Sequence, residues 1–256
     1  GITVATPDYP ISKKIAEICK EKNPGSWTVI GGIHSTSVPE RIDNIFDKVV
    51  IGEGENSFLK IIEDFNKKNN EKRFYSSDLI KNLDELAYPA RHLLPFSSVF
   101  SKNALFSESK SCATTIISSR GCPNNCSFCA SEKMWTRKVR FRSSENVADE
   151  MKEIIENYGV RDFRFQDDTM TINRSRLEKI CREIEKLDVR WRVGTRVDCI
   201  DRNILKIMKK AGCEEQAFGI ESLDQDVLDR NNKRTSLEEI YKAMEYSKEV
   251  GMLTRL

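Results

Sequence analysis

The second half of the chain repeats a strand followed by a helix, and this repeat restricts the possible fold more than any other feature. Short apolar segments near residues 114–118, 162–167, 191–197 and 214–220 are expected strands, and amphipathic helical patterns separate them. Strands that alternate with helices form parallel sheets. Four successive units therefore predict a partial TIM-like (β/α) barrel, in which functional residues gather at the carboxyl ends of the strands.

Three of the expected helices have recognisable first residues. Ser175 with Glu178 and Thr235 with Glu238 fit the capping-box pattern, in which an acid follows a hydroxyl residue at the third position. Asp201 precedes another helical pattern and can cap it. These residues predict where the helices begin.

The first part of the chain shows the same alternation over a shorter length. Apolar strands are expected at 28–30 and 49–51, with a helical pattern before the first and after the second. Continuous apolar strands of this kind favour a parallel sheet covered on both faces. We therefore expect a partial doubly wound, Rossmann-like α/β domain at 1–66, a charged and proline-containing linker at 67–111, and the partial barrel at 112–256.

Charge and hydropathy exclude some classes of protein. The 42 Lys and Arg residues nearly balance the 40 Asp and Glu residues, so the net charge of +2 does not point to any particular polyanionic partner. No apolar run approaches the roughly 20 residues of a membrane helix, and no basic and hydrophobic leader follows Gly1. We expect a cytoplasmic protein that does not enter a membrane. Because the chain lacks an initiator Met and ends in a strand-like pattern, we also expect it to be a fragment.

Three cysteines lie close together directly after the first barrel strand. Cys122, Cys126 and Cys129 are three of the eight cysteines, and this grouping suits a metal site in a reducing compartment better than disulfide bonds. Structural zinc takes four ligands, usually in two close pairs, and the only histidines are His34 and His92. A four-iron cluster that is bound by three thiolates leaves one iron open for chemistry.

The spacing of these cysteines, with Phe128 directly before the last one, resembles the motif of the radical S-adenosylmethionine (SAM) superfamily. The resemblance covers residues 112–256. It implies that Cys122, Cys126 and Cys129 bind a 4Fe-4S cluster and that the open iron binds SAM, with Phe128 beside it. One electron from a flavodoxin- or ferredoxin-like donor would then cleave the sulfonium and give a 5'-deoxyadenosyl radical, which acts on a small-molecule or peptide substrate.

The resemblance also implies which polar residues meet SAM. Gln166, Asp167 and Asp168 end the second barrel strand, where the superfamily carries a Gly-Gly-Glu-like segment, although the residues here differ from it. Arg196 ends the third strand, where a guanidinium suits the methionine carboxylate. Glu221 ends the fourth and can contact the ribose or the amino group. Each charged residue could instead form a structural ion pair or a helix cap.

Two glycine segments follow the strands of the first domain. Together, upstream of the cysteine loop, they resemble the cobalamin-binding domain of one large radical SAM class, and the segment from Leu83 to Arg91 resembles the connector of that class. Glycine lets a large ligand approach the backbone closely. The resemblance implies that cobalamin lies beside Thr6, Gly31, Gly32, His34, Gly52 and Glu53.

The leading hypothesis is therefore a cobalamin-dependent radical SAM methyltransferase, or a relative that catalyses a rearrangement or cyclisation. Two alternatives stay open. The first is methylthiolation of transfer RNA, because basic residues interleave with aromatic ones after the cysteines. These residues are Lys133, Trp135, Arg137, Lys138, Arg140, Phe141 and Arg142. A solvated loop explains that pattern better, and we do not expect a nucleic-acid partner. The second is a non-catalytic iron-sulfur protein that transfers electrons.

Overall fold

The computed structural model describes residues 1–102 and 112–256. The chain divides into two compact units. Unit 1 comprises Gly1–Lys81 and Phe128–Lys138, and unit 2 comprises Asn82–Ser127 and Val139–Leu256. The expected linker is thus divided between the units at Lys81, and its residues 103–111 lie outside the described part of the chain. Within the described residues, no helix is both long and apolar enough to span a membrane.

Unit 1 is a parallel four-stranded sheet in the order β1-β2-β3-β4. The strands are β1 (Ile2–Thr3), β2 (Val29–Gly31), β3 (Lys48–Ile51) and β4 (Phe74–Ser76). The helices are α1 (Tyr9–Lys22), α2 (Ile33–Ser37), α3 (Glu55–Asn66) and α5 (Ser131–Trp135), and α5 packs on α2. Neighbouring strand residues point to opposite faces. Ile30 packs with Ala16 of α1, whereas Val29 packs with Ile61 of α3, so helices cover both faces as expected.

The helices of unit 1 approach the sheet through small residues. Ser12 and Ala16 of α1 and Ser57 of α3 are fully buried, because small side chains let a helix backbone lie close to the strands. Apart from the buried Ile61, most of the larger apolar residues of the two helices are exposed. They are Ile11, Ile15, Ile18, Phe58, Leu59, Ile62 and Phe65. The helical periodicity therefore locates these helices correctly but does not show which side faces the sheet.

Unit 2 is built on a six-stranded sheet in the order β12-β11-β10-β9-β6-β5. Its strands are β5 (Ser101–Lys102), β6 (Cys112–Ile116), β9 (Asp162–Phe165), β10 (Arg190–Thr195), β11 (Cys213–Phe218) and β12 (Leu253–Arg255). All pairs are parallel except β5 with β6. The four barrel strands expected from the sequence correspond to β6, β9, β10 and β11, with shifts of one or two residues at their ends.

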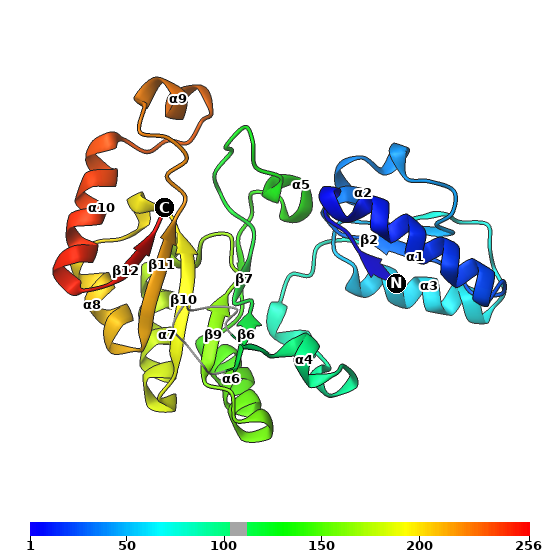
Figure 1. Cartoon of the computed structure of the whole chain (residues 1–256), viewed down its shortest axis with the longest axis horizontal. Helices are drawn as coiled ribbons and strands as arrows, with labels where there is room; N and C mark the ends of the chain where they lie inside the picture. The colour runs from blue at the N-terminus through cyan, green and yellow to red at the C-terminus, as the bar shows by residue number, and fades with distance from the viewer. Residues whose placement is uncertain (103–111) are drawn as a thin grey trace. The chain divides into compact units, whose positions relative to one another are not determined.

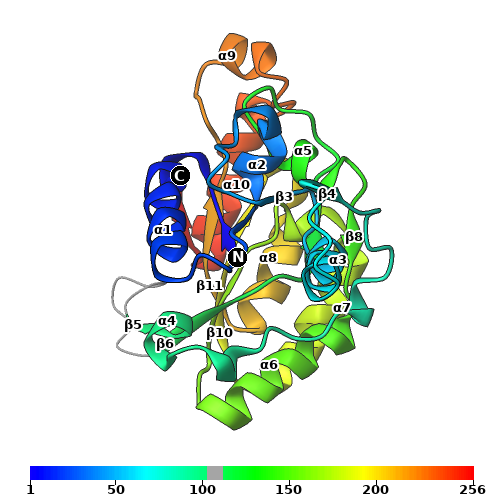
Figure 2. The same cartoon turned by 90° about the vertical axis from the view of Figure 1, so that its right-hand side faces the viewer.

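Four long helices form one layer on one face of this sheet (Figures 1 and 2). They are α6 (Ser144–Tyr158), α7 (Arg174–Ile184), α8 (Arg202–Lys210) and α10 (Leu237–Val250), with the shorter α4 (Phe96–Val99) and α9 (Gln225–Arg230) elsewhere in the unit. Consecutive helices of the layer contact each other. They bury Phe163, Phe165 and Trp191, whereas the alternate residue Arg164 is exposed. Helices on one side only are typical of a barrel wall, which confirms the expected fold class.

The helix starts confirm one of the three expected caps. Asp201 accepts hydrogen bonds from the backbone amides of Asn203 and Ile204 and begins α8. The other two predictions are wrong by one or two residues, because Asn173 caps α7 and Ser236 forms the capping box of α10 with Glu239. Which of several neighbouring hydroxyl and amide residues caps a helix depends on side-chain geometry, which the spacing of residues in the sequence does not give.

The connector from Asn82 to Arg91 is docked on α6 rather than free. The backbone amide of Ser143 donates to Asp84 (2.9 Å), and the Tyr88 hydroxyl donates to a backbone carbonyl of α6 (3.0 Å). Arg91 reaches the buried Glu150 (2.7 Å), whose other oxygen pairs with Arg142. Charged groups at both ends of this segment therefore tie it to unit 2.

Candidate active site

The cysteine loop leaves the sheet of unit 2 at the carboxyl end of β6. The antiparallel strands β7 (Ser119–Arg120) and β8 (Arg140–Phe141) pair with each other and close its base. All three cysteines of the loop are free thiols. The loop therefore stands where the chemistry of a barrel is expected.

Hydrogen-bond donors surround two of the thiols. The side-chain amide of Asn124 lies 3.4 Å from the sulfur of Cys122, and the Thr169 hydroxyl lies 3.7 Å from it. The guanidinium of Arg196 approaches the sulfur of Cys126 to 3.9 Å. The thiolate is the form of cysteine that binds metal, and these polar groups lie beside two of the three sulfurs.

The third thiol differs from the other two. Cys129 is exposed, and the backbone amide of Ser131 lies 3.5 Å from its sulfur. Cys129 belongs to unit 1, whereas Cys122 and Cys126 belong to unit 2. Across residues 1–102 and 112–256, no three Cys, His, Asp or Glu side chains form a group that could hold one metal ion. The fit to an iron-sulfur cluster consequently rests on donor chemistry, because three soft thiolates suit it.

Asp167, which was expected at SAM, is turned toward the base of the cysteine loop. It accepts hydrogen bonds from the backbone amide of Ser118 (2.7 Å), the Ser118 hydroxyl (2.6 Å) and the Ser119 hydroxyl. Burial raises the pKa of Asp167, and the bonds from the two serines oppose that rise. Its neighbour Asp168 accepts from the backbone amide of Gly121 (3.2 Å). Both carboxylates thus anchor the first residues of the loop. Asp167 is buried, whereas Gln166 and Asp168 are exposed.

The structure brings Arg196 and Glu221 together through a lysine that the sequence did not single out. Arg196 forms a two-pronged ion pair with Asp198 (2.8 Å for both bonds) and donates to the backbone carbonyl of Lys233 (2.8 Å). The ammonium of Lys233 lies 3.3 Å from Glu221. Asp198 occupies two nitrogens of the guanidinium, which leaves the nitrogen near Cys126 for a ligand. No local pattern marks Lys233, since it reaches the site only through the turn after α9.

Unit 1 has a cavity of about 460 Å³ at the carboxyl ends of its strands. Gly31, Gly32 and Gly52, all expected at cobalamin, line it, as do Met134 and Trp135 of α5. Gly32 has φ +94°, and a Cβ atom there would lie 2.9 Å from the backbone nitrogen of Val4. Glycine is therefore required at this position. The sequence pointed to Trp135 only as part of the basic stripe, and its place in the cavity was missed.

The other residues expected at cobalamin lie outside that lining. Thr6 and His34 contact each other (3.1 Å between the hydroxyl and Nδ1), and the His34 ring stacks near Tyr9. The Nε2 atom of His34 is buried without a hydrogen-bond partner in the described residues. Glu53 is also buried and accepts from the backbone amide of Ile80 (2.8 Å), so it anchors the end of unit 1.

The basic and aromatic stripe after the cysteines does not form one exposed surface. Arg140 is buried, and Arg142 bonds to Glu150 and Asn146 inside unit 2. Phe141 packs under the guanidinium of Arg176. Two of the five expected phosphate contacts are therefore structural. Lys133, Arg137 and Lys138 are exposed, so the observation that favoured an RNA partner is weakened.

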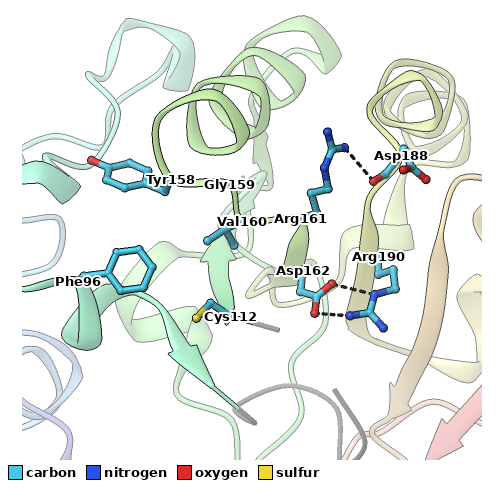
Figure 3. A pocket seen from close by; sticks show the side chains of 9 residues that line it. All are labelled: Phe96, Cys112, Tyr158, Gly159, Val160, Arg161, Asp162, Asp188 and Arg190. Atoms are coloured by element: carbon cyan, nitrogen blue, oxygen red, sulfur yellow. Dashed lines mark hydrogen bonds and ion pairs between the residues drawn. The ribbon is translucent and has the colours of Figure 1, made fainter. Parts of the chain in front are cut away.

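Unit 2 has a cavity of about 500 Å³ at the amino ends of β6, β9 and β10 (Figure 3). Arg190 donates to both oxygens of Asp162 across its floor (2.9 and 2.6 Å). The cysteine loop leaves the opposite ends of these strands. Because barrel chemistry takes place at the carboxyl ends, we assign this cavity no part in the reaction.

Comparison with known proteins gives the family. The model of the radical SAM superfamily matches residues 116–255, which is more than half of the chain and contains all three cysteines of the loop. The chain therefore belongs to the radical SAM superfamily.

Two curated relatives are similar to almost the whole chain. The chain is 31% identical over 271 residues to an uncharacterized methyltransferase of Pyrococcus horikoshii, with 98% of this chain and 58% of the relative covered. It is 30% identical to the anaerobic magnesium-protoporphyrin IX monomethyl ester cyclase of Rubrivivax gelatinosus, covering 99% of this chain and 49% of that enzyme. The chain thus spans about half the length of these relatives.

The fold is shared with the radical SAM methyltransferase TsrM of Kitasatospora setae, whose structure was solved with cobalamin and a [4Fe-4S] cluster bound. The TM-score is 0.72 at 16% identity, with 96% of this chain and 52% of TsrM covered. At this identity the likeness concerns the fold of the chain.

Proposed function

We propose that the chain is the cofactor-binding part of a radical SAM enzyme that also binds cobalamin, and that the whole enzyme transfers a methyl group to an unactivated carbon or catalyses a related radical reaction such as a cyclisation. The observation that carries the proposal is the loop of three free thiols at the carboxyl end of β6 in a chain of this superfamily. The matched methyltransferase and cyclase support the two reaction types.

In this proposal Cys122, Cys126 and Cys129 hold a 4Fe-4S cluster, which when bound supplies the electron that cleaves SAM. The residues of the chain prepare the site. Asn124 donates toward the sulfur of Cys122, and the Thr169 hydroxyl lies beside the same sulfur. Arg196 offers its nitrogen near Cys126 to the methionine carboxylate.

Other polar groups complete the proposed SAM site. Glu221, beside Lys233, accepts a hydrogen bond from the ribose or the amino group, and the exposed Gln166 contributes its amide at the end of β9. Phe128 is exposed beside Cys129 and offers its ring to the adenosine. A flavodoxin- or ferredoxin-like donor and a small-molecule or peptide substrate are the partners that such a reaction requires.

The glycine-lined cavity of unit 1 is the proposed cobalamin site. Its backbone carries no side chains at Gly31, Gly32 and Gly52, so a flat and bulky ligand can approach the strand ends. The cavity volume of about 460 Å³ admits part of such a ligand. Thr6 and His34 are not in the cavity lining, and the buried His34 Nε2, which has no hydrogen-bond partner in the described residues, is a polar atom that a ligand could satisfy.

The decisive experiment uses the full-length enzyme, reconstituted with iron and sulfide without oxygen. With dithionite and SAM we expect 5'-deoxyadenosine, detected by chromatography. Cys126→Ala should abolish the product and the cluster absorbance, because one of the proposed ligands is lost. Cys181→Ala is the matched control, since this thiol is buried in the core between α7 and the sheet, and it should retain the product. Equal loss in both variants would contradict the ligand assignment.

A further inference from the structure

The uncovered face of the unit 2 sheet carries a row of polar side chains. Strand register places Thr115 beside Arg164, Arg164 beside Arg192, and Arg192 beside Glu215, across β6, β9, β10 and β11. These residues alternate with the buried residues that meet the helix layer. The row therefore lies on the side that faces inward in a barrel.

Positive charge is in excess on this face. Glu215 pairs with both Arg192 (3.2 Å) and Arg255 (2.8 Å), so one carboxylate serves two guanidinium groups. Arg164 is exposed and forms no hydrogen bond or ion pair within the described residues. Burial, and then the repulsion of Arg164, lower the pKa of Arg192, which agrees with two cations that lie side by side on this face. Asp167 borders the same space, but its oxygens accept bonds from Ser118 and Ser119.

Small residues make room above the arginines. Gly194 and Ala217 are neighbours in the next row toward the carboxyl ends, and a Cβ atom added at Gly194 would meet nothing within 4 Å. The result is a cavity of about 390 Å³ with Arg164, Arg192 and Arg255 in its wall and Gln166 at its upper edge. A ligand that enters from the end where the cysteine loop stands can reach these arginines.

We propose that this face binds an anionic group, a carboxylate or a phosphate, of the substrate, with Arg164 as the principal contact. The proposal rests on the proposed function, since it places the substrate of a radical SAM enzyme in the barrel. A planar guanidinium that lacks a partner can donate two parallel hydrogen bonds to such a group. The cavity wall carries three arginines and two carboxylates, so a bound anion balances the remaining positive charge.

SAM also carries a carboxylate, so the test must separate the two sources of anion. The anaerobically reconstituted full-length enzyme is titrated by calorimetry with inorganic pyrophosphate, with succinate and with SAM, at constant ionic strength. Arg164→Gln should weaken the binding of pyrophosphate, succinate or both by about 10- to 100-fold. This is the loss of affinity expected when one hydrogen bond to a charged group is removed. The affinity for SAM should change less than twofold.

Two further variants make the result specific. Arg164→Lys keeps the charge and should lose less affinity than Arg164→Gln. Arg182 is an exposed arginine of α7, on the helix side of the sheet, and forms no hydrogen bond or ion pair within the described residues. Arg182→Gln should therefore leave the binding of the anions unchanged. The proposal is overturned if wild-type protein shows no saturable binding of either anion, if Arg182→Gln weakens it equally, or if SAM loses as much affinity as the anions. These titrations need no cleavage of SAM, so an absence of 5'-deoxyadenosine contradicts the proposed function and not this site.

Discussion

The carboxylate of Asp167 meets three donors where the cysteine loop begins, and it is fully buried there. Such a group is a positioning residue: it fixes the backbone of Ser118 and the side chain of Ser119, which lead into β7 and the first cysteine. The sequence predicted the strand end at which Asp167 lies but not its partners. Ser118 and Asp167 are 49 positions apart, and only the pairing of β6 with β9 brings them together.

Asp167→Ala should lower the free energy of unfolding by about 1–3 kcal/mol, because it leaves the amide of Ser118 buried without an acceptor. We also expect less iron per chain after reconstitution, since the loop loses its anchor. Urea unfolding and iron analysis measure the two effects. Asp149→Ala, an exposed carboxylate on α6, should change neither value. Full iron content in Asp167→Ala would show that the loop does not depend on this anchor.

The thiols differ in reactivity because their surroundings differ. Burial raises the pKa of Cys181 to about 12, and burial together with Asp198 raises the pKa of Cys199 to about 12. At pH 8 a thiol with such a pKa is about 0.01% thiolate, and only the thiolate reacts. Cys19 and Cys129 are exposed.

In cluster-free folded protein at pH 8, iodoacetamide should therefore modify Cys19 and Cys129 and spare Cys181 and Cys199. After reconstitution, Cys129 should be protected while Cys19 still reacts, which makes Cys19 the internal control. Peptide mass spectrometry reads both patterns. Continued modification of Cys129 in cluster-loaded protein would remove it from the ligand set.

At the scale of elements, periodicity located the helices and strands well because it reports one physical property, the alternation of buried and exposed positions. It did not identify the side of α1 and α3 that faces the sheet. Ser12, Ala16 and Ser57 are buried there, and small residues carry little hydrophobic signal. It also missed that the connector residues Asp84 and Arg91 dock on α6, since their partners are polar and distant in sequence.

The docking of the connector depends on Glu150, which is 2% exposed and pairs with Arg91 and Arg142. Glu150→Ala should destabilise unit 2 by about 3–5 kcal/mol, because it leaves two buried guanidinium groups without their carboxylate. Limited proteolysis should then cut faster between Asn82 and Arg91. The control is Glu153→Ala, which removes an exposed acid three residues further along the same helix. This variant should be cut at the wild-type rate. An unchanged rate in Glu150→Ala would mean that this ion pair does not hold the connector.

At the scale of the whole molecule, the sequence predicted the two α/β parts and the superfamily, because strand-helix order and the cysteine motif are local patterns. The assignment of Phe128–Lys138 to unit 1 could not be predicted, since this segment lies within the barrel half of the sequence. The cavity of unit 1 is consequently lined by residues from both halves of the chain.

Cobalamin should therefore stabilise the full chain if it binds in that cavity. At a concentration 100 times its dissociation constant, a ligand of the folded state adds about 2.7 kcal/mol. We expect hydroxocobalamin to raise the melting temperature of the wild type and of Gly25→Ala, a position outside the cavity lining where a Cβ atom would meet only the Asn23 side chain, at 3.8 Å. Gly32→Ala should lose this rise, because the added carbon contacts the Val4 backbone and the positive φ disfavours alanine. A rise of equal size in Gly32→Ala would place cobalamin elsewhere.

Because helices cover only one face of the unit 2 sheet, alternate residues of one strand serve either packing or the uncovered face. Phe163 and Phe165 hold the protein together, while Arg164 between them is free to be exchanged without loosening the packing. An engineer could thus redesign what the scaffold accepts by altering every second position of β9 and β10, and could raise its heat resistance by altering the positions in between.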